Sequence, residues 1–126
     1  MKETYELAVQ LPFDDYAGID WAMTAEEYEE FLEYCNDYSI WNEEKYQDLL
    51  SAAATAAADY IVRNYCEADD ADKYESEGYC TPARLMDYLD KTDDYWEEFI
   101  NSDGLRKREL LTELLWENRA FYVNEY

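Results

Sequence analysis

The chain has 126 residues and carries 32 Asp and Glu against 10 Lys and Arg, with no His, so its formal net charge is −22. This length predicts a single domain with one core. No apolar run is long enough to span a bilayer, and the N-terminus lacks the profile of a signal peptide. We therefore expect a cytoplasmic protein that does not bind membranes, since an anionic lipid surface would repel it.

The composition argues against catalytic, cofactor and metal sites. Without histidine, neither a Ser–His–Asp nor a Cys–His arrangement can form. The three glycines are too far apart in the chain to make a phosphate-binding loop. Residues 70–74 begin like a calcium loop, but Glu75 stands where that loop needs glycine. We expect no enzyme activity, no cofactor and no dedicated metal site. The three cysteines, Cys35, Cys66 and Cys80, are expected to be free thiols in a reducing compartment, with a disulfide between two of them as the alternative.

The N-terminal segment predicts a strand. Polar and apolar residues alternate over Thr4–Leu11, and Pro12 ends the pattern. The residues expected to face the core are Tyr5, Leu7, Val9 and Leu11. A solvated loop is expected to follow through Asp14, Asp15 and Asp20.

Two helices are predicted next. Thr24 and Glu27 have the spacing of a capping box, which predicts a helix from Thr24 to Tyr38. The buried stripe of this helix is expected to be Tyr28, Phe31, Leu32 and Cys35. Asn42 is expected to cap a longer helix that runs to about Cys66. This helix is apolar nearly all round at residues 51–58, which predicts a central, buried position.

The second half of the chain predicts a loop and three further elements. Residues 67–78 are rich in acids and predict the loop. Thr81 followed by Pro82 predicts a helix start, with Leu85, Met86 and Leu89 buried. A helix from Thr92 to about Asp103–Gly104 carries Tyr95, Trp96, Phe99 and Ile100. The last helix starts near Leu105 and buries Leu110, Leu111, Leu114, Leu115 and Phe121.

Residues 120–126 fit either a continuation of the last helix or a strand, which could pair with the N-terminal strand. The predicted fold class is α+β, mostly α. It is a compact bundle of four to five helices around an alanine-rich central helix, with an N-terminal strand that a C-terminal strand can pair.

The acids are distributed unevenly. Thirteen acids and no base lie between Lys2 and Lys45, and seven acids and one base lie between Leu85 and Leu105. Glu26, Glu30, Glu33 and Asp37 recur on one helix face, as a row about 16 Å long with roughly 5–6 Å between neighbours. DNA carries about one phosphate per 3.4 Å of axis on each strand, so the two charge densities are comparable. An ordinary solvated helix face is the alternative interpretation.

We interpret these acids as a partner-binding surface that imitates DNA. The candidate residues are Asp14, Asp15, Asp20, Glu26, Glu27, Glu29, Glu30, Glu33, Asp37, Asp87, Asp90, Asp93, Asp94 and Glu97. A direct nucleic-acid interaction is not expected, because the whole-molecule field is repulsive.

Two features do not belong to this pattern. Arg106, Lys107 and Arg108 form the one basic cluster, which is expected either to balance acids of the same chain or to join two subunits. Trp116 lies opposite the apolar stripe of the last helix. It is expected to be covered by another part of the chain, such as the N-terminal strand, with a homodimer contact as the alternative.

In size, acidity and helical character the chain resembles the acidic DNA-mimic proteins of phages and mobile elements. These are the Ocr-like anti-restriction proteins and the acidic anti-CRISPR inhibitors. The alanine-rich segment from Tyr46-Gln47-Asp48-Leu49-Leu50 to Asp59-Tyr60 carries part of this likeness. The resemblance implies a stoichiometric inhibitor in the bacterial host cell that occupies the basic cleft of a CRISPR surveillance complex, or alternatively of a restriction–modification enzyme.

Two other functions fit the same composition. An acidic immunity-type or adaptor protein would neutralise one basic protein through a few strongly contributing residues, without imitating DNA. A structural protein would use its charge for solubility alone.

Overall fold

The fold was analysed in a computed structural model, which describes residues 1–34, 38–66, 78–91 and 93–125. Within these ranges the chain forms strands β1 (Glu3–Gln10) and β2 (Tyr16–Met23), helix α1 (Ala25–Tyr34) and two short 3-10 helices, η1 (Tyr38–Asn42) and η2 (Glu44–Tyr46). Helices α2 (Gln47–Tyr65), α3 (Pro82–Tyr88), α4 (Asp93–Ile100) and α5 (Gly104–Glu117) follow, and strand β3 (Tyr122–Glu125) ends the chain. The predicted α+β fold class is confirmed.

The three strands form one antiparallel sheet in the order β2-β1-β3. The C-terminal strand pairs with β1 as predicted, with Val9 opposite Val123. The main partner of β1 is β2, where Val9 lies opposite Ala17 and Leu7 opposite Ile19. The predicted loop at residues 14–20 is therefore wrong from Tyr16 onward. These residues continue β1 as a hairpin, and Ala17, Ile19, Trp21 and Met23 supply a second alternating apolar face.

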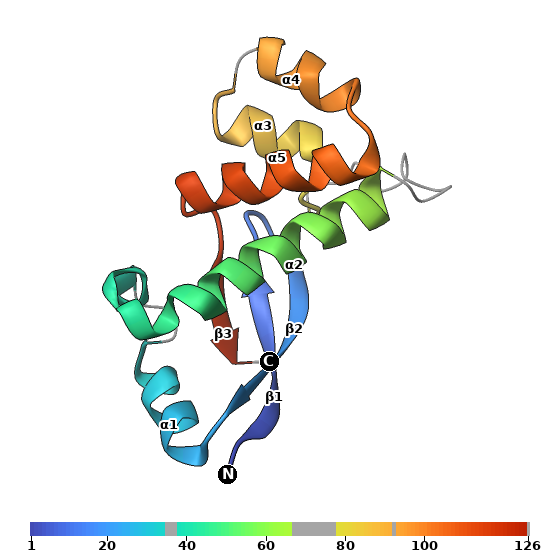
Figure 1. The fold of residues 1–126 in the computed structure, drawn as a ribbon. Helices are drawn as coiled ribbons and strands as arrows, with labels where there is room; N and C mark the ends of the chain where they lie inside the picture. Colours follow the sequence, from blue (N-terminus) through green and yellow to red (C-terminus); the bar gives the residue numbers. More distant parts are fainter. Residues whose placement is uncertain (35–37, 67–77, 92, 126) are drawn as a thin grey trace.

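Helix α2 lies at the centre of the fold, as its alanine-rich sequence predicts. It covers one face of the sheet and packs on its other side against α5 and, over a smaller area, α3, with α4 beyond (Figure 1). The fully buried residues of α2 include Leu50, Ala53, Ala54, Ala57, Ala58, Ile61 and Val62. Small side chains let α2 come close to both neighbours, so one helix serves two layers of the core.

Several predicted boundaries and burial positions are wrong in detail. The second helix begins at Gln47 and not at Asn42, because η1 and η2 occupy residues 38–46. The described part of α1 runs to Tyr34, Tyr38 belongs to η1, and the predicted burial of Cys35 lies outside the described residues. Leu32 and Ile100 are 37% and 48% exposed, since α1 and α4 each rest on the core along a narrow stripe centred on Phe31 and Phe99.

Candidate partner-binding surface

Helix α1 presents a row of carboxylates because its other side is fixed to the core. The capping box forms as predicted. The Thr24 backbone N–H donates to Glu27, and the Glu27 N–H donates to the Thr24 hydroxyl. Tyr28 stacks on Tyr5 of β1 at 4.0 Å between ring centroids, and Phe31 is fully buried. These contacts set the rotation of the helix. The exposed acids on its opposite face are Glu26, Glu29, Glu30 and Glu33.

Two acids of α1 have partners inside the molecule. Glu30 forms an ion pair with Lys45, whose ammonium group also lies over the rings of Tyr34 and Tyr46. Glu27 belongs to the capping box, and its hydrogen bonds with Thr24 lower the pKa of its carboxyl group. Glu26, Glu29 and Glu33 have no basic group within ion-pair distance among the described residues. Asp37, the fourth member of the predicted row, lies outside the described residues.

A second acidic surface lies on α3 and α4. Its exposed residues are Asp87, Asp90, Asp93, Asp94 and Glu97. Helix α4 packs against α5, where the Tyr95 hydroxyl donates to the Leu110 carbonyl at 2.9 Å. Figure 1 shows α1 and α4 at opposite ends of the molecule. The acids of α1 and those of α3 and α4 therefore form two separate surfaces.

Asp15 is not part of either surface, and its predicted place in a solvated loop is wrong. Its side chain is only 7% exposed and accepts hydrogen bonds from the hydroxyls of Tyr60 (2.9 Å) and Tyr65. The backbone N–H groups of Tyr16 (3.0 Å) and Cys80 (3.1 Å) also donate to it. Asp15 thus joins the hairpin turn to the end of α2 and to the segment before α3. A buried carboxylate held in this way stabilises the fold and cannot contact a partner.

The surroundings of Asp15 are apolar enough to affect neighbouring groups. Burial, together with the charge of Asp15, raises the pKa of the Cys80 thiol to about 12. Burial and hydrogen bonding also raise the pKa of the Tyr65 hydroxyl. Cys80 and Cys66 are free thiols, as expected, and the buried Cys80 is held in its unreactive, protonated form.

The remaining two candidates lie on the hairpin. Asp14 is exposed in the turn, and Asp20 is exposed on β2 directly opposite Glu6 of β1. Like charges at directly opposed positions destabilise a sheet. The chain therefore keeps acids at exposed positions where they do not help folding.

The basic cluster at residues 106–108 is used inside the molecule, the first of the two predicted alternatives. Arg106 pairs with Glu98 (3.3 Å) and Glu109 (3.1 Å). Arg108 pairs with Asp59 of α2 (2.8 Å), which also supports the contact between α2 and α5. These pairs neutralise Arg106 and Arg108 within the chain, and one of them also neutralises Glu98 of α4.

Trp116 packs on the core, as predicted, and a residue of η1 covers part of it. Trp41 of η1 lies against it edge to face at 5.3 Å between ring centroids. Glu113 and Glu117, one turn apart on α5, are exposed beside Trp116 and were not among the predicted candidates. The sequence offers a signal for them, because the two acids lie four residues apart on the solvent side of the helix with an aromatic residue between them.

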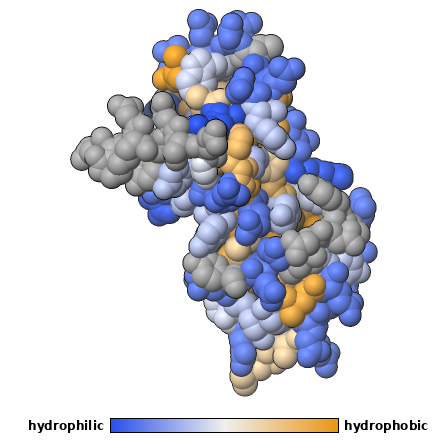
Figure 2. Space-filling view, turned by 180° about the vertical axis from the view of Figure 1, so that it is seen from behind, coloured by the Kyte–Doolittle hydropathy of each residue, from blue (hydrophilic) through white to orange (hydrophobic). Residues whose placement is uncertain are grey.

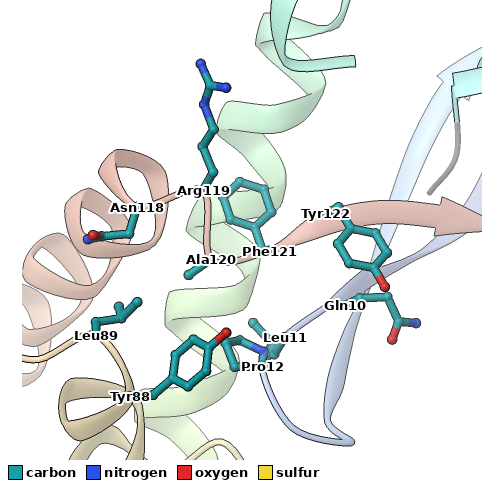
Figure 3. Close-up of a pocket in the computed structure, with 10 residues that line it drawn as sticks. All are labelled: Gln10, Leu11, Pro12, Tyr88, Leu89, Asn118, Arg119, Ala120, Phe121 and Tyr122. Carbon is teal, nitrogen blue, oxygen red and sulfur yellow. The ribbon is translucent and has the colours of Figure 1, made fainter. Parts of the chain in front are cut away.

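A cavity of about 290 Å³ lies where β1, α3 and the turn between α5 and β3 meet (Figure 3). Pro12 and Tyr88 close one side, and Tyr122 lies on the other. Arg119 adopts a left-handed backbone conformation (φ 48°) after α5, and its guanidinium group lies over Trp41. Figure 3 shows the Arg119 side chain extending away from the cavity, so no charged group points into it there.

The rest of the described surface carries few signs of another site. Figure 2 shows a face covered mainly by hydrophilic residues, with apolar areas small and separated. No three acidic or cysteine side chains in the described ranges come together as metal ligands do. None of the described helices combines the length and the apolar character that crossing a bilayer requires.

Comparison with known proteins gives no family for this chain. No protein-family model, curated protein or solved structure matches it.

Proposed function

We propose that the protein is a DNA-mimic inhibitor. It occupies the basic DNA-binding cleft of a bacterial defence complex and blocks the binding of target DNA. An RNA-guided CRISPR surveillance complex is the favoured target, and a restriction–modification enzyme is the alternative. The protein acts in the cytoplasm of the bacterial host, by stoichiometric binding and without chemistry of its own.

The exposed, uncompensated acids of α1 carry this proposal. Glu26, Glu29 and Glu33 follow one another at spacings of three and four residues along a helix face and have no described ion-pair partner. Like charges at i, i+3 and i, i+4 destabilise a helix. A chain that keeps such a row without neutralising it loses stability, and a partner that supplies the missing positive charges would account for that loss.

The position of the two acidic surfaces supports a target with an extended basic cleft. Helices α1 and α4 stand at opposite ends of the fold, so a partner that contacts both must be basic over a comparable length. A cleft built to follow a duplex has this property, because phosphates continue along the whole of its ligand.

A second candidate function is the immunity-type or adaptor protein, which binds one basic protein through a few residues. The aromatic residues at the hairpin turn and on α3 favour it. Phe13 has a left-handed backbone (φ 70°), is 40% exposed and lies edge to face with Tyr88, itself 63% exposed. Exposed aromatic side chains are frequent anchors of specific protein interfaces.

Displacement of labelled DNA separates the two functions. A fluorescent duplex bound to a purified surveillance complex, and in parallel to a restriction enzyme, is titrated with the protein at two salt concentrations. A mimic displaces the duplex in competition with it, and its affinity falls steeply as salt rises. Single Glu→Gln changes on α1 have small effects. If Phe13→Ala or Tyr88→Ala alone abolishes binding while salt has little effect, the protein is of the immunity type.

A further inference from the structure

A pocket of about 260 Å³ lies between α2 and α5, which run side by side (Figure 1). Ser51 and Ala54 line it from α2. From α5 it receives one aromatic ring, one hydroxyl and two carboxylates, those of Trp116, Thr112, Glu113 and Glu117. One wall of the pocket is therefore aromatic, and two negative charges lie beside that wall.

The two carboxylates are available to a ligand. Glu113 and Glu117 are exposed, and no Lys or Arg of the described chain lies within ion-pair distance of either. They also create a negative potential around them. Burial, and after it the charges of Glu113, Glu98 and Glu117, raises the pKa of the Tyr95 hydroxyl to about 12.

The aromatic wall is packed against a buried aromatic residue. Trp41 is buried and lies against Trp116 at an interplanar angle of 65°. An indole ring fixed in this way loses little conformational freedom when a ligand stacks on it.

Aromatic rings of this chain lie against cations elsewhere, in one case with a carboxylate beside the ring. The Lys45 ammonium group pairs with Glu30 and lies 5.5 Å from the centroid of the Tyr46 ring. The Arg119 guanidinium carbon lies 5.5 Å from the Trp41 ring centroid. Cations are attracted to the faces of aromatic rings, and most strongly to tryptophan. In the pocket between α2 and α5, the ring and the carboxylates belong to this chain and the cation does not.

We propose that this pocket binds one arginine side chain of the basic partner, so the proposal rests on the proposed function. A planar guanidinium group can stack on the Trp116 indole while its N–H groups donate to Glu113 and Glu117. A lysine ammonium group offers neither the plane nor the fork of donors. The pocket adds a specific contact to a surface that otherwise acts through overall charge.

The test uses N-acetyl-arginine methylamide as the probe and the full chain labelled with ¹⁵N. The four indole N–H resonances are followed by NMR during titration, and a Trp116→Phe variant assigns the relevant one. We expect a saturable shift of the Trp116 indole resonance in the wild type. The affinity for the probe should be at least fivefold lower in the variant Glu113→Gln/Glu117→Gln. A variant with the same charge change on the sheet, Glu3→Gln/Glu6→Gln, should bind the probe within twofold of wild type. Equal shifts at all four indoles, or equal binding of N-acetyl-lysine methylamide, would overturn the arginine assignment.

A second variant tests the pocket by filling it. Ser51→Arg places a guanidinium group of the chain itself beside Trp116 from an exposed helical position. It should raise the melting temperature and abolish the shift caused by the probe, and an unchanged titration would contradict the proposal.

Failure of the pocket and failure of the proposed function are distinguishable. If wild type displaces DNA from its target but does not bind the probe, the pocket is wrong. If it binds the probe but displaces no DNA, the mimic function is wrong.

Discussion

The acidic row of α1 leads to a prediction in which stability and inhibition change in opposite directions. The perturbation is the triple variant Glu26→Gln/Glu29→Gln/Glu33→Gln. It leaves Glu30 in place, because removing that carboxylate would leave Lys45 without its partner. Glutamine is a good helix former and has nearly the same shape as glutamate, so the change removes charge and little else.

The expected magnitude follows from the helix geometry. The four exposed acids make four like-charge pairs at i, i+3 or i, i+4, and the variant relieves all of them. Each such pair costs roughly 0.2–0.5 kcal/mol. Glu26 lies in the first turn of α1, where a negative charge is favourable by about 0.3–1 kcal/mol, and the variant loses that contribution. The free energy of unfolding should therefore rise by about 0.5–1 kcal/mol, which corresponds to a melting temperature roughly 2–4 °C higher for a domain of this size.

Calorimetry in low salt measures the stability change, and displacement of a labelled duplex from the target measures inhibition. The rise in melting temperature should shrink as salt increases, because exposed charges are screened. Inhibition should weaken relative to the matched control Glu3→Gln/Glu6→Gln/Glu125→Gln, which removes three exposed acids of the sheet instead. A lower melting temperature would refute the description of α1 as a repulsive exposed row. Inhibition equal to that of the control would show that α1 is not the contact surface.

Three further predictions concern the interior. Asp15→Ala should lower the free energy of unfolding by about 3 kcal/mol or more in urea titrations, since it leaves several buried donors without an acceptor. Asp15→Asn should be less damaging, and equal stability of both variants would contradict the proposed role of the carboxylate. Trp116→Ser should reduce stability by about 2–3 kcal/mol through the loss of its packing on Trp41, with an unchanged solution mass by light scattering. Dissociation of a dimer would instead assign Trp116 to a subunit interface. Raising pH should destabilise the fold, because the raised pKa values of Cys80, Tyr46 and Tyr95 favour their protonated forms in the folded state. This stability is fully present below about pH 9 and is lost toward pH 12, and a flat urea midpoint from pH 9 to 12 would refute it.

Several elements were predictable because their signals are local. The capping box at Thr24 and Glu27 forms hydrogen bonds between residues three positions apart, so no distant contact is needed to start α1. Thr81 and Pro82 begin α3 in the same way, with the Arg84 N–H donating to the Thr81 hydroxyl. The central position of α2 was predictable because a helix that is apolar nearly all round has to be covered on more than one side.

Strand β2 was missed although its signal is present. Asp14, Asp15, Gly18 and Asp20 favoured a loop, while the apolar residues at 17, 19, 21 and 23 alternate with them as a strand requires. The segment forms a strand because its backbone groups and its apolar side each find a partner elsewhere in the chain. Pairing with β1 satisfies its backbone, and α2 covers its apolar side.

Composition and contacts within one or two turns account for the charge of this protein, the starts of α1 and α3 and the burial of its central helix. What the individual acids do depends on contacts between distant parts of the chain. Asp15 is buried by residues 45 to 65 positions later in the chain, and Glu30 is neutralised by a lysine 15 positions later. A carboxylate becomes a surface charge, a pair member or an internal acceptor according to what the fold places beside it, and contacts over such distances leave no periodic signal in the sequence.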